Sequence, residues 1–141
     1  MNQVSNILVR KGTCVPVFSE IDVVVHPRRF ILVCVTLSGE STWHVVTGPA
    51  YLLGPTLLNE FIITSGLYLE PNPYINVVGG GTLRVDHETN TILVSGISKE
   101  YGPVAENHIK HLFEILREYF PRESWEIVRK KHTQAKRSVL K

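Results

Sequence analysis

The segment from Gly79 to Pro103 limits the folds open to this chain more than any other stretch of its sequence. It opens with three consecutive glycines, which allow another backbone to approach closely or a strand to bend sharply. Apolar positions at 83–85 and 92–94 flank a polar, turn-prone stretch at 86–90, and this pattern predicts a β-hairpin. The loop at 98–103 then leads into a strongly helical pattern. A strand, a polar loop and the start of a helix are the usual components of an anion-binding site.

Apolar periodicity along the rest of the chain predicts several strands and two helices. The predicted strands cover 21–25, 30–37, 43–46, 74–78 and 124–129, and the helices cover 56–66 and 103–120. We expect the run Phe30 to Leu37 to be a central strand buried on both faces, because nearly all of it is apolar. Thr56 is the expected N-cap of the first helix, Gly66 its C-terminal stop, and Pro103 the first position of the second helix. Because the helices are not regularly interleaved with the strands, the order predicts an α+β domain with a mixed sheet.

Length and composition favour one ordinary globular domain. The chain has 141 residues, of which 43% are hydrophobic and 20% charged, and it has no apolar run of the roughly 18 residues that a membrane span needs. Its two cysteines, Cys14 and Cys34, have neither a metal-ligand spacing nor the number for a disulfide framework. The cysteine content therefore predicts an intracellular protein, of the cytoplasm or the mitochondrion. The length of the chain predicts one domain, over residues 1–127. Residues 1–20 are expected to form an N-terminal arm or a loose strand.

The last 14 residues, 128–141, are expected to form a basic C-terminal tail. This segment contains no acidic residue and six basic ones, Arg129, Lys130, Lys131, Lys136, Arg137 and Lys141, whereas the remaining residues carry more acidic than basic side chains. Basic tails often contact nucleic acid or an acidic protein. The tail thus predicts an RNA or protein partner and no membrane partner, with a solvated end as the alternative.

Three short motifs at a joint spacing resemble the Janus/Ocnus family, whose best-known members are small phosphohistidine phosphatases. They are the glycine triplet Gly79-Gly80-Gly81, the strand end Gly96-Ile97-Ser98 and the helix approach Tyr101-Gly102-Pro103. The resemblance covers about residues 29–127. It implies a sheet of about five or six strands flanked by two helices. It also implies a phosphoryl group held by backbone amides and a basic residue, with a catalytic histidine just before the first helix.

The resemblance assigns candidate phosphate-binding residues in this chain. Arg29 stands where the family has a basic residue before its first long strand, and Gly79 and Ser98 match the family's loop residues. Lys99 adds a positive charge beside Ser98. The structural alternatives are that Arg29 is a charge flanking a strand and that the glycines only let two strands turn.

The catalytic residue implied by the family is missing. Counting back from the glycine triplet without gaps places the family histidine at Leu57, which can neither accept a proton nor carry a phosphoryl group. The family arginine after the glycines is Thr82 here. Glu100 follows Lys99 where the phosphatases have uncharged side chains, and its carboxylate would repel phosphate if it pointed inward. His108 and His111 lie three residues apart, but no further ligand completes a metal site, and we expect neither a metal nor a cofactor.

Two hypotheses of different class follow. In the first, the domain keeps the fold, has lost catalysis and serves as a binding or structural subunit of a larger assembly, for which a ribonucleoprotein is one setting. In the second, it is an active phosphohistidine phosphatase with a displaced base. The choice between them depends on the site, because a fold does not determine a function. Leu57 in place of the family histidine favours the first hypothesis.

Overall fold

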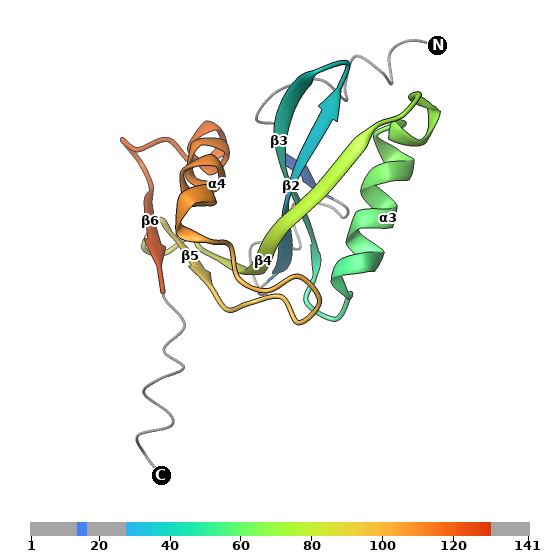
Figure 1. The fold of residues 1–141 in the computed structure, drawn as a ribbon. Helices are drawn as coiled ribbons and strands as arrows, with labels where there is room; N and C mark the ends of the chain where they lie inside the picture. Colours follow the sequence, from blue (N-terminus) through green and yellow to red (C-terminus); the bar gives the residue numbers. More distant parts are fainter. Residues whose placement is uncertain (1–13, 17–27, 131–141) are drawn as a thin grey trace.

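The computed structural model describes residues 14–16 and 28–130, which form one six-stranded sheet and two helices (Figure 1). The strands are β1 (Cys14–Pro16), β2 (Arg28–Leu37), β3 (Glu40–Pro49), β4 (Tyr74–Asp86), β5 (Thr91–Ser95) and β6 (Glu126–Arg129). The helices are α3 (Gly54–Thr64) and α4 (Glu106–Tyr119), and a short 3-10 turn, η1 (Leu67–Leu69), follows α3. The sheet order is β1-β3-β2-β4-β5-β6. Its two outer pairs, β1·β3 and β5·β6, are parallel and the others are antiparallel, so the predicted α+β fold with a mixed sheet is confirmed.

Strand β2 lies at the centre of the sheet and separates two hydrophobic cores. It pairs with both β3 and β4, and Ile31, Leu32 and Val33 are fully buried, as the apolar run predicted. Alternation along the strand turns Leu32 toward the core under α4, and Ile31 and Val33 toward the core under α3. Figure 1 shows the two helices on opposite sides of the sheet. Each helix therefore covers one face of the same central strand.

The glycine triplet lies inside a strand. The separate strands predicted at 74–78 and 83–85 are one continuous strand, β4, and the hairpin with β5 forms as predicted. The pairing of β2 with β4 has a β-bulge next to Gly79: the register shifts between Leu32 and Val33, and Val78 is the extra residue. The alternative that the glycines let two strands turn is wrong, because all three lie within one continuous strand.

The starts of both helices differ from the sequence-based prediction. The N-cap of α3 is Leu53, and Thr56 lies inside the first turn with Pro55 before it. Helix α4 begins at Glu106, so Pro103 precedes it and belongs to the loop that crosses β4. The end of α3 agrees with the prediction, because Gly66 follows the C-cap in a left-handed conformation with φ of 80°.

Some predicted features lie outside the described residues. These are the strand at 21–25, nearly all of the N-terminal arm and the tail residues Lys131, Lys136 and Arg137. Strand β6 includes Arg129, so the first residues assigned to the basic tail belong to the sheet. Within the described part of the chain, neither helix has the length and apolar character needed to cross a membrane.

Candidate anion-binding site

Arg29 and Ser98, two of the predicted phosphate-binding residues, lie at one end of the sheet near the start of α3. Arg29 projects from β2 and donates from Nη2 and Nε to the carbonyl oxygen of Ala50, at 3.0 and 3.3 Å. Ala50 belongs to the turn between β3 and α3. The guanidinium is therefore anchored to the loop that leads into α3, and its charge acts on the carboxylate of Glu100.

Ser98 is buried and its hydroxyl is already used within its own loop. The Tyr101 backbone N–H donates to Ser98 Oγ at 3.1 Å, and Ser98 Oγ donates to Glu100 Oε1 at 3.3 Å. The backbone N–H of Gly102 also donates to the Ser98 carbonyl at 2.8 Å, which closes the loop into a tight turn. Ser98 thus orders this loop and directs its one hydroxyl proton toward Glu100.

Glu100 is exposed, and its carboxylate lies against the N-terminus of α3. Oε1 accepts a hydrogen bond from the backbone N–H of Gly54, the first residue of the helix, at 3.2 Å. Desolvation raises the pKa of this carboxyl group. Hydrogen bonds from Gly54, from its own backbone N–H and from Ser98, together with the charge of Arg29, lower the pKa, and the net result lies below the ordinary value. The carboxylate is therefore ionised at neutral pH and held by the local donors.

The groups around Glu100 are those that bind phosphate in other proteins. A helix N-terminus, a hydroxyl and a guanidinium each favour an anion at this place. Here the anion is a side chain of the same protein. Glu100 is exposed and not inward-pointing, but its Oε1 accepts hydrogen bonds from the Gly54 N–H and the Ser98 hydroxyl.

Tyr101 covers the start of α3 beside Glu100. A Cβ atom at Gly54 would lie 2.7 Å from Cε2 of the Tyr101 ring, so only glycine leaves room for this contact. Burial, and then the charge of Glu100, raise the pKa of the Tyr101 hydroxyl. The tyrosine of the Tyr-Gly-Pro motif thus has a packing role at the helix terminus.

Gly79 and its two neighbours make room for other backbone segments. A Cβ atom at Gly79 would lie 2.5 Å from the Pro103 carbonyl oxygen, one at Gly80 2.4 Å from that of Phe30, and one at Gly81 2.6 Å from that of Ser95. Gly80 also donates its N–H to the Gly102 carbonyl at 2.9 Å. Gly79 therefore lets the 98–104 loop cross β4 at close range, whereas Gly80 and Gly81 make room for the backbone of β2 and β5, and these roles are structural.

The other residues singled out from the sequence, Lys99 and Leu57, take no part in the hydrogen bonds around Glu100. Lys99 is exposed at the tip of the same loop, and no hydrogen bond or ion pair of its side chain is found among residues 14–16 and 28–130. Leu57 is fully buried with Ile31, Val46 and Phe61 in the core under α3. An imidazole at that place would face the core and not the carboxylate of Glu100.

The described histidines occupy other parts of the molecule. His44 is buried under α3, where its ring lies 5.3 Å from that of Phe61, two turns along the helix from Gly54. His108 and His111 lie on α4 beside Trp43, and His111 stacks on that ring at 4.0 Å. His87 is in the β4–β5 turn. No group of residues able to hold a metal occurs in the described part of the chain, and His26 and His132 lie outside it.

Two features of the site were not predicted from the sequence. The backbone groups of Gly54 and Ala50 contribute to it, although neither residue belongs to a motif. The sequence predicts that the charge of Glu100 opposes phosphate. It does not predict that Glu100 accepts hydrogen bonds from the Gly54 N–H and the Ser98 hydroxyl. The only signal was a carboxylate two residues after the serine, and this spacing does not tell which way the side chain points.

Comparison of the chain with models of known protein families gave no match, and comparison with curated proteins gave none either.

Proposed function

We propose that this protein is a catalytically inactive relative of the phosphohistidine phosphatases that acts as a binding or structural subunit of a larger assembly. The observation that carries the proposal is the position of Glu100. Its ionised carboxylate takes the Gly54 N–H and the Ser98 hydroxyl, which are donors that a phosphoryl group would need. A phosphoryl dianion at this place would meet the negative charge of this carboxylate.

The position of Leu57 supports the same conclusion. A phosphohistidine phosphatase needs a group that accepts a proton or the phosphoryl group itself. Leu57 offers neither, and its side chain is enclosed in the α3 core.

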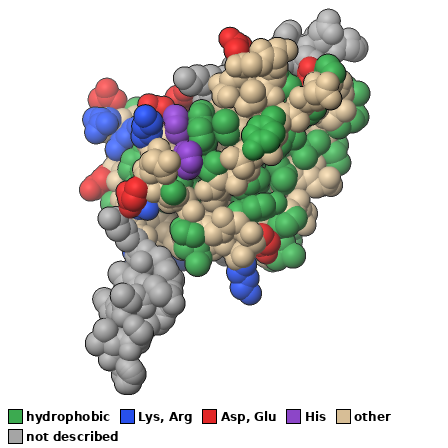
Figure 2. Space-filling view, viewed as in Figure 1, with side chains coloured by type: hydrophobic (Ala, Val, Ile, Leu, Met, Phe, Trp, Pro, Cys, Tyr) green, Lys and Arg blue, Asp and Glu red, His purple; other side chains and the backbone are tan. Residues whose placement is uncertain are grey.

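Exposed apolar side chains support a binding role. Tyr51, Tyr68, Leu69 and Tyr74 are each more than 60% exposed, and Ile63 of α3 is 52% exposed. Figure 2 shows many hydrophobic side chains on the face that carries α3 and β4. Exposed apolar side chains gathered on one face often mark a surface that contacts other macromolecules.

The test is release of phosphate from a phosphohistidine peptide by the full-length protein. We expect no release above that of the heat-denatured protein. Release that is sustained over many turnovers, and that His26→Ala or His132→Ala abolishes, would instead establish an active phosphatase with a displaced base.

A further inference from the structure

Strand β6 is an open edge of the sheet. It is the last strand in the sheet order, and no other strand in the described part of the chain pairs with its outer side (Figure 1). The backbone N–H groups of Glu126 and Lys130 donate to carbonyl groups of β5 and of the residue before it. In a parallel pair, alternate residues direct both of their backbone groups to the same neighbour. The N–H and C=O groups of Ile127 and Arg129 therefore face outward.

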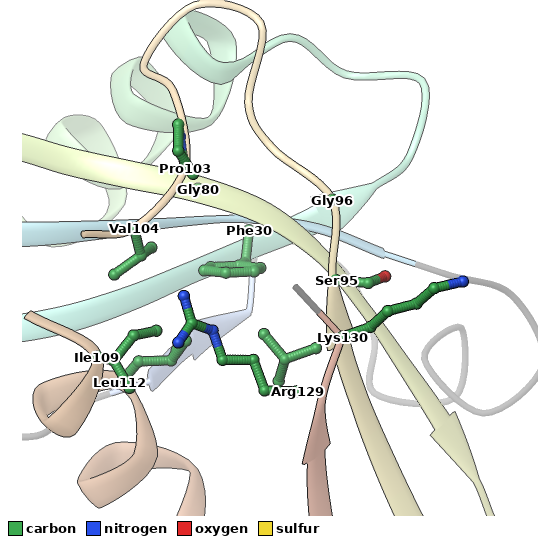
Figure 3. Close-up of a pocket in the computed structure, with 11 residues that line it drawn as sticks. Phe30, Gly80, Ser95, Gly96, Pro103, Val104, Ile109, Leu112, Arg129 and Lys130 are labelled. Atoms are coloured by element: carbon green, nitrogen blue, oxygen red, sulfur yellow. The ribbon is translucent and has the colours of Figure 1, made fainter. Parts of the chain in front are cut away.

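The side chains of β6 divide between the two faces of the sheet. Ile127 packs against the core under α4, and Arg129 Nη1 donates to Glu106 Oε2 of α4 at 2.9 Å. Figure 3 shows the Arg129 side chain directed into a small cavity beside α4, and Lys130 directed away from it. Because side chains alternate along a strand, the other residues of this edge lie on the opposite face, and all of them are exposed: Glu126, Val128 and Lys130.

Val128 ends a row of side chains on this second face of the sheet. Leu93 of β5 is the neighbour of Val128, and Arg84 of β4 is the neighbour of Leu93. None of the three is part of the core under α3. Val128 is 37% exposed, and Leu93 is partly exposed. An apolar side chain therefore lies at the margin of the sheet, beside backbone groups that face outward.

The charges on this face stand in a self-complementary order, because Glu126 begins β6 and Lys130 follows its last residue. An antiparallel second copy must set outward-facing residues opposite each other. Pairing Ile127 with Arg129 of the second copy then sets Val128 opposite its own counterpart. The same register sets Glu126 opposite Lys130. Opposite charges that face each other across two strands are favourable, and like charges are unfavourable.

The neighbouring registers lack this complementarity. Pairing Arg129 with its own counterpart sets two positive charges opposite each other and sets Val128 opposite Lys130. Pairing Ile127 with its own counterpart sets Val128 opposite Glu126. A polyanion such as RNA would meet the carboxylate of Glu126 on the same face. The order of charges therefore favours a second copy of this chain at the edge, in a single register.

We propose that β6 pairs antiparallel with β6 of a second copy, so that the two six-stranded sheets become one continuous sheet. Main-chain hydrogen bonds join Ile127 of each copy to Arg129 of the other, and the two Val128 side chains meet at the symmetry axis. Glu126 of each copy contacts Lys130 of the other. This pairing does not depend on the loss of catalysis proposed above.

Strand β6 has 4 residues, so the interface is small and association is expected to be weak, with a Kd on the order of 0.1 mM. Sedimentation velocity of the full-length protein, over a range of concentrations that includes this value, measures it. Glu126→Lys and Lys130→Glu should each weaken association about fivefold, because each sets like charges opposite each other. Arg122→Glu reverses an exposed charge outside β6 and should have no effect.

A mixture of the two variants gives the sharper result. In an equimolar mixture, a Glu126→Lys chain can pair with a Lys130→Glu chain, and both contacts between positions 126 and 130 then join opposite charges. The mixture should associate about as strongly as wild type, although neither variant does so alone.

Disulfide formation tests the register. In a full-length chain with Cys14→Ala and Cys34→Ala, Val128→Cys should form an intermolecular disulfide with oxidised glutathione. Directly opposed residues that are not hydrogen-bonded have Cα atoms about 4.5 Å apart, which a disulfide can span. Glu126→Cys is the matched control. Its two copies would lie at least about 13 Å apart in this register, so it should not cross-link.

A protein that stays monomeric at every concentration would overturn the proposal. So would cross-linking of Glu126→Cys as fast as that of Val128→Cys, or a variant mixture that associates no better than each variant alone. Association that persists in the charge variants but is lost from a chain ending at Lys130 would place the contact in the tail and also overturn it. None of these results bears on phosphate release, which decides separately whether the protein is an inactive phosphatase relative.

Discussion

Glu100 and Gly54 are joined by a hydrogen bond of 3.2 Å that brings a carboxylate from the loop after β5 onto the first backbone N–H of α3. The two residues are 46 positions apart in the sequence. The bond places a negative charge where the helix dipole and Arg29 both favour one. It therefore stabilises the packing of the loop on the helix and uses donors that an external anion would need.

The first prediction concerns the pH dependence of stability. The pKa of Glu100 is lower in the folded than in the unfolded protein, so its stabilising effect is complete above the unfolded pKa. This effect is lost as the pH falls through the lowered, folded-state pKa. We expect the free energy of unfolding of wild type to exceed that of Glu100→Gln at pH 6, with the difference shrinking toward pH 3. Urea titrations at both pH values measure it, with the exposed turn variant Glu88→Gln as the control. A difference that grows as the pH falls would contradict the assignment.

The second prediction concerns the glycine triplet. Gly80→Ala should lower the free energy of unfolding by about 2–3 kcal/mol, because the new methyl group would meet the Phe30 carbonyl oxygen at 2.4 Å. Gly39→Ala is the matched control. It has a φ of 84° but no atom within 4 Å of the added Cβ, so it should cost only about 1 kcal/mol. Chemical denaturation compares the two, and equal losses would show that the close approach of the Phe30 carbonyl to Gly80 does not limit the side chain at this position.

The third prediction concerns the position counted as that of the family histidine. Leu57→His should not create phosphatase activity, because Leu57 faces the α3 core. It should lower the free energy of unfolding by about 3 kcal/mol through loss of apolar burial and burial of a polar ring. Leu57→Met, which nearly conserves volume, should cost less than about 1.5 kcal/mol. Phosphate release by a folded Leu57→His protein would show that this side chain reaches the site.

The fourth prediction concerns the basic tail. A chain that ends at Lys130 keeps β6 and removes the remaining tail residues. We expect it to lose partners that bind the full chain through charge, and we expect the full chain to lose the same partners at high salt. Co-purification at low and high salt measures both effects. If the shortened chain retains every partner at every salt concentration, the tail makes no contribution to binding.

The sequence was sufficient to predict the class of fold and most of the elements. The apolar run of β2, the hairpin of β4 with β5 and the face of α4 each follow from local periodicity. The start of α4 was not predicted correctly, because the loop that crosses β4 holds Pro103 outside the helix. That crossing is a tertiary contact and leaves no local signal.

The site was predictable only in part, because it also depends on tertiary contacts that leave no local signal in the sequence. Arg29 and Ser98 could be named from a resemblance, but their partners could not. Ala50 and Gly54 contribute through backbone atoms, which every residue has, so their identity carries little information. The direction of the Glu100 side chain depends on the packing of the loop against α3.

The most direct test of the central claim is a phosphate titration of wild type and of Glu100→Gln, followed through the backbone amides of Gly54, Ser98 and Tyr101. We predict weak, barely saturable shifts in wild type and clearly tighter binding in Glu100→Gln, because the variant removes the competing charge and leaves Arg29 and the helix N-terminus in place. Glu88→Gln should behave as wild type. Equal phosphate affinity in wild type and Glu100→Gln, or shifts confined to residues after Lys130, would contradict the claim that Glu100 occupies an anion-binding site.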